Sequence, residues 1–127
     1  MSWDDYYRRR AAIKAVLAYA HQHPEAGVPF AAVPSAQQMF KDRHELVLAL
    51  QYDWSRALWS RIELLSLESR GPVLADAQDL ARQAWDQAAA ANPVLRRLLD
   101  GVRDELGSAG AREQDLLVTA GLGRHVA

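Results

Sequence analysis

Residues 42–69 read DRHELVLALQYDWSRALWSRIELLSLES, and this stretch predicts the longest helix of the chain. Asp42 and Glu45 have the D-x-x-E spacing of a capping box, in which side chains bind the unpaired N–H groups of a helix start. Gly71 and Pro72 end the helix just beyond the stretch. Apolar residues recur at helical spacing and form one face. That face consists of Val47, Leu50, Trp54, Ala57, Leu58 and Leu65.

The rest of the chain is also rich in helix-favouring residues, and it contains no alternating apolar run that would indicate a strand. Ser2 and Asp5 begin a first helix that ends near His23, before Pro24. Residues 30–33 allow one short turn, and Ser35 caps a short helix through Phe40. Three further helices are expected over residues 72–91, 93–106 and 111–120, with Asn92 capping the second of them. We therefore predict an all-α chain with one domain over residues 1–127, a compact bundle of five main helices plus one or two short ones.

Composition restricts the classes of function. The 127 residues suit one domain and contain no cysteine, which excludes disulfides and thiolate chemistry. The formal net charge is -1, whereas a dedicated nucleic-acid binder usually has a basic excess. The charged N-terminal stretch MSWDDYYRRR is unlike a signal peptide, and no apolar run is long enough for a membrane span. These features predict a cytoplasmic protein that does not enter membranes.

No residue pattern indicates catalysis. The four histidines lack the Glu-x-x-His or His-x-x-x-His spacing of a bundle metal site. The pairs Asp76/Asp79 and Asp100/Asp104 lie on polar helix faces, where solvated carboxylates are the simpler interpretation. Phosphate loops, dinucleotide fingerprints and nucleophile elbows are missing. We predict a non-enzymatic protein without metal or cofactor.

The long helix carries apolar residues on a second side. Leu48, Tyr52 and Trp59 lie well round from its core face and form a ridge suited to a homodimer contact. A different hypothesis places an aromatic pocket for an unidentified small molecule between this helix and the helix of residues 72–91. That pocket would be lined by Trp54, Leu58, Ala81 and Trp85. For each tryptophan, an ordinary core position is the simpler alternative.

Basic residues are concentrated at one point. Arg8, Arg9 and Arg10 form the densest basic cluster and could contact phosphates or an acidic partner. The alternative is a solvated helix flank, in which Asp4 and Asp5 pair with arginines one turn away.

Residues 9–54 resemble the N-terminal region of the tetracycline-repressor (TetR) family. The resemblance lies in a first helix with RRAAIKAVLAYAHQH, a short connecting region, and MFKDRHELVLALQYDW leading into a long helix. It implies a helix-turn-helix with Phe40 as a core aromatic, and a regulator that binds DNA, although FAAVPSAQQMF is shorter than the family's recognition region. The DNA-contacting residues so implied, together with the basic cluster, are Arg8, Arg9, Arg10, Gln37, Gln38, Lys41 and Arg43.

The sequence thus predicts a dimeric, TetR-like helical protein with a regulatory role, whose DNA binding is retained or degenerate. Two alternatives stay open. One is a protein-interaction module that works through its helix surfaces, and the other is a small-molecule-binding bundle.

Overall fold

The computed structural model describes residues 2–68 and 77–103, and every regular element in this part of the chain is a helix. The protein is all-α, as predicted. The helices are α1 (Trp3–Gln22), α2 (Pro34–Met39), α3 (Arg43–Glu68), α4 (Ala77–Ala91) and α5 (Pro93–Gly101). Gly71, Pro72 and the expected helix of residues 111–120 lie outside the described residues.

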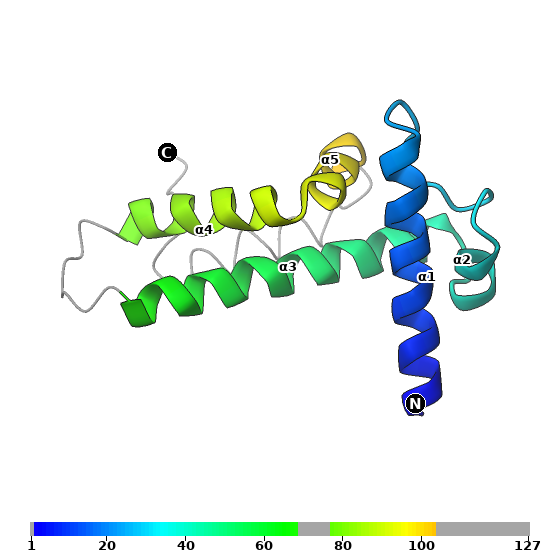
Figure 1. Ribbon diagram of the computed structural model, residues 1–127, viewed down its shortest axis with the longest axis horizontal. Helices are drawn as coiled ribbons and strands as arrows, with labels where there is room; N and C mark the ends of the chain where they lie inside the picture. The colour runs from blue at the N-terminus through cyan, green and yellow to red at the C-terminus, as the bar shows by residue number, and fades with distance from the viewer. Residues whose placement is uncertain (1, 69–76, 104–127) are drawn as a thin grey trace.

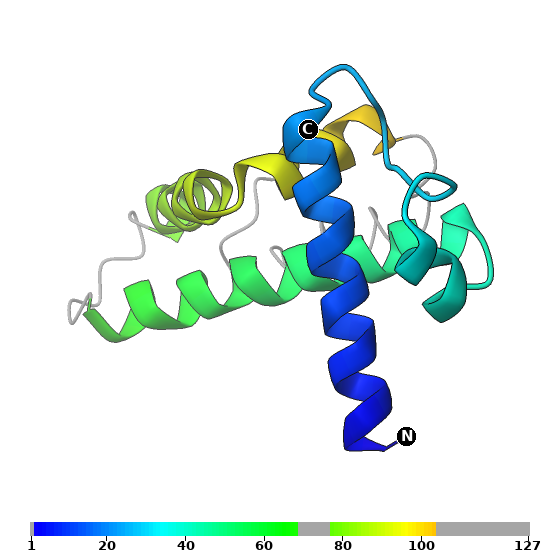
Figure 2. The same ribbon diagram turned by 45° about the vertical axis from the view of Figure 1, so that its right-hand side comes forward.

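The helices pack in two directions. α3 and α4 lie antiparallel and side by side, whereas α1 crosses α3 near the N-terminal end of α3 (Figure 1). α2 packs on α1, and α5 turns back from α4 to contact α1, α3 and α4. After a 45° turn, α1 still extends well past α3 at its N-terminal end (Figure 2). The described helices therefore form one packed body with one projecting helix end.

Capping side chains begin the two longest helices where the sequence predicts. The hydroxyl of Ser2 accepts the Asp5 N–H at 3.2 Å and caps α1. Asp42 Oδ1 accepts the Glu45 N–H at 2.8 Å at the start of α3. Glu45 reaches back to the N–H of Lys41 at 3.3 Å, one residue earlier than in a standard capping box. These bonds satisfy donors that a helix start leaves unpaired.

The short helix α2 begins differently from the prediction. Its N-cap is Val33 and its first residue is Pro34, so Ser35 lies inside the helix and does not cap it. Proline fits this first position because its fixed φ is helical and it has no N–H to leave unpaired. The expected turn at residues 30–33 is present, since the Val33 N–H donates to the Phe30 carbonyl at 3.3 Å.

At the junction between α4 and α5, the prediction that Asn92 caps the second of these helices is wrong. Asn92 makes no side-chain cap to α5, and its Nδ2 instead donates to the Ala88 carbonyl at 3.0 Å. The Asn92 backbone N–H donates to the same carbonyl at 3.0 Å, so the backbone and the side chain of Asn92 both close the end of α4. α5 ends at Gly101, and the N–H of its C-cap residue Val102 donates to the Leu98 carbonyl. Residues 104–106 of the expected helix lie outside the described residues.

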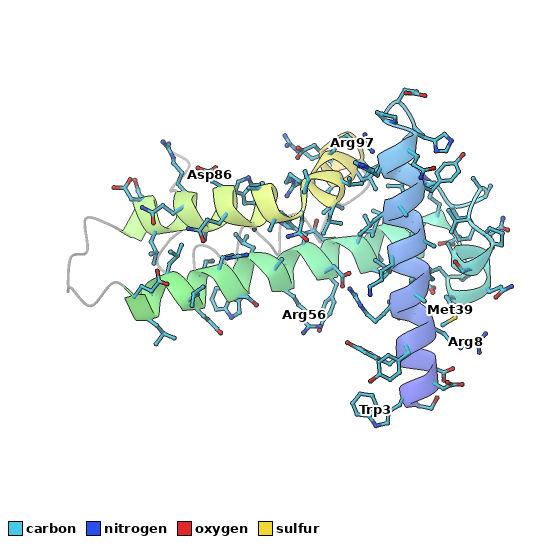
Figure 3. The ribbon with its side chains drawn as sticks, viewed as in Figure 1. Trp3, Arg8, Met39, Arg56, Asp86 and Arg97 are labelled. Carbon is cyan, nitrogen blue, oxygen red and sulfur yellow. The ribbon has the colours of Figure 1, made fainter. Side chains whose placement is uncertain are left out.

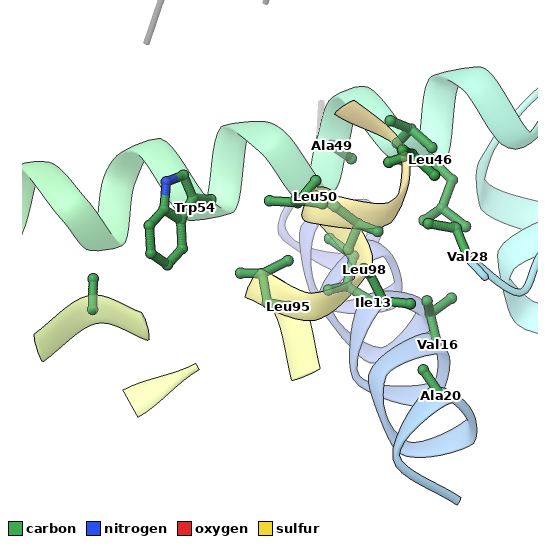
Figure 4. Packing of buried hydrophobic residues seen from close by; sticks show 14 of the residues in the cluster. Ile13, Val16, Ala20, Val28, Leu46, Ala49, Leu50, Trp54, Leu95 and Leu98 are labelled. Atoms are coloured by element: carbon green, nitrogen blue, oxygen red, sulfur yellow. The ribbon is translucent and has the colours of Figure 1, made fainter. Parts of the chain in front are cut away.

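The core lies where α1, α3 and α5 meet, and it continues between α3 and α4. Figure 4 shows Ile13 and Val16 of α1 facing Leu95 and Leu98 of α5, with Leu50 of α3 beside them. Of the predicted core face of α3, Ala57 is half-buried and the other residues are buried. Leu46 and Ala49 are also buried, on the side of α3 that α1 crosses. One helix therefore contributes to two parts of the core.

Candidate interaction surface

The second apolar side of α3 is exposed. Leu48, Tyr52 and Trp59 are 40%, 64% and 36% exposed, whereas Trp54 and Leu58 on the core face are buried. At 100° per residue the three exposed side chains fall within a narrow arc. We call Leu48, Tyr52 and Trp59 the α3 ridge. The structure thus places together the residues that the sequence predicts for a dimer contact.

A second exposed apolar cluster lies at the start of α1. Trp3, Tyr6 and Tyr7 are 76%, 41% and 62% exposed. Trp3 contacts both tyrosines, with ring centroids 6.0 and 6.1 Å apart, and the tyrosine rings are 5.4 Å apart. Residues 2–8 are all exposed, so this end of α1 projects as an arm from the body. We call residues 2–8 the α1 arm.

Reasoning from the sequence singled out Arg8 of the α1 arm as a basic residue, but it missed the aromatic cluster as a site. The spacing Trp3, Tyr6, Tyr7 places the rings on one side of a helix, and this signal was present in the sequence. The sequence does not give the point at which α1 crosses α3. This crossing leaves the first two turns of α1 without a neighbouring helix (Figure 1).

The arm and α3 enclose a corner. Figure 3 shows Trp3 and Arg56 on the inner side of this corner, and Arg8 on the opposite side of α1 beside Met39 of α2. The guanidinium of Arg56 lies 5.9 Å from the centre of the Tyr52 ring, which connects the corner to the α3 ridge. The corner is therefore lined by exposed aromatic groups from both helices.

An ion pair holds the two sides of the corner together. Nη1 of Arg10 donates to both carboxylate oxygens of Asp53, at 2.9 and 2.7 Å. The Asp53 side chain is 16% exposed and that of Arg10 is 37% exposed, so solvent screens the pair only in part. The contact joins α1 to α3 directly above the arm and restricts the angle between them.

The residues implied for DNA contact divide into two groups. Arg9 lies over the Phe40 ring at 4.8 Å, Arg10 pairs with Asp53, and Nε of Arg43 donates to the Val28 carbonyl at 3.3 Å. These three cations are used in packing α1, α2 and the loop before α2 against α3. The side chains left exposed are those of Arg8, Gln37, Gln38 and Lys41. Arg8 and Arg9 form no ion pair with Asp4 or Asp5 in the part of the chain described.

The candidate pocket residues lie in the core or pack against it. Trp54 is fully buried, Leu58 is buried, and Ala81 and Trp85 are half-buried. The two tryptophan rings meet edge to face, with centroids 4.9 Å apart. Arg96 of α5, which the sequence did not single out, places its guanidinium 4.4 Å from the Trp54 ring and 4.8 Å from the Trp85 ring. Asp100 forms an ion pair of 3.0 Å with Arg96. A ligand pocket lined by the four candidate residues stays a prediction.

Within residues 2–68 and 77–103, His, Asp and Glu side chains form no group of three that could hold a metal ion. In the same part of the chain, every helix is too short or too polar to cross a membrane.

The chain was compared with known proteins. No family model, no curated protein and no solved structure matches it.

Proposed function

We propose that this protein is a helical protein-interaction module that self-associates through the outer side of α3. The observation that supports the proposal is the α3 ridge, in which Leu48, Tyr52 and Trp59 stay exposed on the longest helix. Large apolar side chains that line one exposed side of a helix favour association with a partner, because leaving them in water costs free energy. Exposed tyrosine and tryptophan are also the side chains that most often dominate binding at an interface.

Replacing the two aromatic residues of the ridge tests this function. We expect the unmodified chain to sediment as a dimer at micromolar concentration. Tyr52→Ser combined with Trp59→Ser should weaken dimerisation by about tenfold or more, because each aromatic anchor contributes more than about 1 kcal/mol. Analytical ultracentrifugation over a concentration series measures the change.

The control is Leu67→Ser. Leu67 is 75% exposed on the same helix but lies about a quarter-turn from the ridge. Its replacement should leave the dimerisation constant unchanged. A chain that remains monomeric up to the highest concentration, or a double variant that dimerises like the unmodified chain, contradicts the proposal.

A second candidate function is that of a DNA-binding regulator, as the TetR resemblance implies. The observation in its favour is that Arg8, Gln37, Gln38 and Lys41 are exposed, and that Arg8 lies on the α2 side of α1 (Figure 3). Glutamine side chains can pair with adenine in the major groove, while arginine and lysine neutralise phosphates.

Binding to duplex DNA tests this candidate. If the protein binds DNA, the duplex should be retarded in a gel at low ionic strength, and Arg8→Ala with Lys41→Ala should flatten the dependence of log K on log salt by about two units. Arg103→Ala, just after the end of α5, serves as the control, because the Arg103 side chain is also exposed but is not among the residues implied for DNA contact. No retardation at the lowest salt concentration eliminates the candidate.

A further inference from the structure

The α1 arm and the corner beside it are both exposed on the same chain. The α1 arm is a projecting helix end with aromatic side chains, and the corner beside it is open toward solvent and lined by aromatic side chains (Figure 3). A two-fold dimer brings the same surface of both chains together, so that each residue contact occurs twice. An arm and a corner on one chain meet this requirement, because each arm can enter the corner of the partner.

The exposed apolar area is of the size that an interface needs. Aromatic side chains present about 150–250 Å² each when fully accessible. At their exposed fractions, Trp3, Tyr6, Tyr7, Tyr52 and Trp59 together leave about 550 Å² to cover. A standard interface buries about 800 Å² on each partner, of which somewhat more than half is apolar. The α3 ridge alone provides much less than this.

Charge favours the same arrangement. Asp4 and Asp5 lie on the arm, and Arg56 lies in the corner. Among the residues that the structure describes, none of these three side chains forms an ion pair. At 100° per residue Asp4 lies next to Tyr7 on the arm, whereas Asp5 lies on the side of Arg8. An arm that enters the partner's corner therefore brings the Asp4 carboxylate near the partner's guanidinium, which favours this register.

We infer that two copies of the chain associate by reciprocal insertion of the α1 arm of each into the α1–α3 corner of the other. The inference rests on the proposed self-association and adds the segment that covers the α3 ridge. In this arrangement Trp3, Tyr6 and Tyr7 of each chain pack on Tyr52 and Trp59 of the partner. The Arg10–Asp53 ion pair joins α1 to α3 at the corner that receives the arm.

Disulfide trapping tests the contact directly, because the chain contains no cysteine of its own. The single variants Tyr7→Cys and Tyr52→Cys are mixed and oxidised under mild conditions. A disulfide between two single-cysteine chains is necessarily intermolecular, and it needs Cα atoms within about 7 Å. We expect a mixed disulfide to form faster between these two variants than in either variant alone. Arg8→Cys with Tyr52→Cys is the matched control, since Arg8 lies on the opposite side of the arm, and it should react slowly.

Sedimentation of arm variants supplies the second measurement. Trp3→Ser with Tyr7→Ser should weaken dimerisation about tenfold or more without loss of helical circular dichroism, since both side chains are largely exposed. Mixing this variant with Tyr52→Ser/Trp59→Ser should restore part of the association, because one intact arm–corner contact then remains in each mixed dimer.

The outcomes separate this inference from the proposed function. If the arm variant dimerises like the unmodified chain while the ridge variant does not, the dimer forms ridge to ridge and the inference is overturned. The same conclusion follows if mixing restores nothing. If the unmodified chain is monomeric, the proposed self-association and the inference both fail.

Discussion

Trp54→Ala is expected to lower the free energy of unfolding by about 3–5 kcal/mol, the largest effect of any single replacement considered for this protein. Trp54 is fully buried on α3, and its ring contacts Trp85 of α4 and the guanidinium of Arg96 of α5. Truncation removes buried apolar area and leaves a cavity where three helices meet. Urea unfolding followed by circular dichroism measures the change.

The matched control for this prediction is Trp59→Ala. Trp59 is a tryptophan of the same helix, but it is 36% exposed on the ridge, so its loss should cost less than about 1 kcal/mol. Because dimerisation adds to apparent stability, both variants should be compared at two protein concentrations. A cost for Trp54→Ala as small as that for Trp59→Ala would mean that the contact of α3 with α4 and α5 is not as described.

Arg97→Ala is expected to cost about 2–4 kcal/mol, an unusually large effect for an arginine. Nη2 of Arg97 donates to the Ala20 carbonyl at 2.6 Å, and Nη1 donates to the Pro24 carbonyl at 3.1 Å. The Ala20 carbonyl otherwise accepts only a long bond of 3.3 Å from the His23 N–H, and the positive guanidinium adds to it at the negative end of the helix dipole. The replacement therefore separates α5 from the end of α1.

Thermal unfolding and hydrogen exchange measure this effect. The amides of the last turn of α1, around Tyr19 and Ala20, should lose protection in Arg97→Ala. Arg103→Ala serves as the control, because the Arg103 side chain is 77% exposed and contacts Asp100 on the surface. Arg97→Lys should recover only part of the stability, since an ammonium cannot span two carbonyls as a planar guanidinium does. Equal stabilities of the Arg97→Ala and Arg103→Ala variants would contradict this account.

Much of the fold could be predicted from local sequence. The all-helical content follows from the composition. The starts of α1 and α3 follow from Ser2 and Asp42, because a cap depends on residues only three positions away. The errors were also local. Ser35 and Asn92 are residues that favour an N-cap, but Pro34 begins α2 one position earlier, and the Asn92 side chain binds the end of α4 instead.

The candidate site was predicted in part. Leu48, Tyr52 and Trp59 could be identified because a helix cannot bury apolar groups all round its circumference against neighbours on one side. The packing roles of Arg9, Arg10 and Arg43 could not be predicted. From the sequence, an arginine that packs against another element cannot be told from one exposed to solvent until the fold shows which groups it contacts. Arg96 and Arg97 were missed for the same reason, as their partners lie on other helices.

The sequence by itself determined the helices, the caps of α1 and α3 and the apolar faces, because each depends on contacts within a few residues. Tertiary structure alone decided which of those faces remain exposed. The crossing of α1 over the start of α3, held by Arg10 and Asp53, leaves the α1 arm outside the body and forms the corner beside it. Such a crossing depends on how side chains from distant parts of the chain pack together, and no local pattern specifies it.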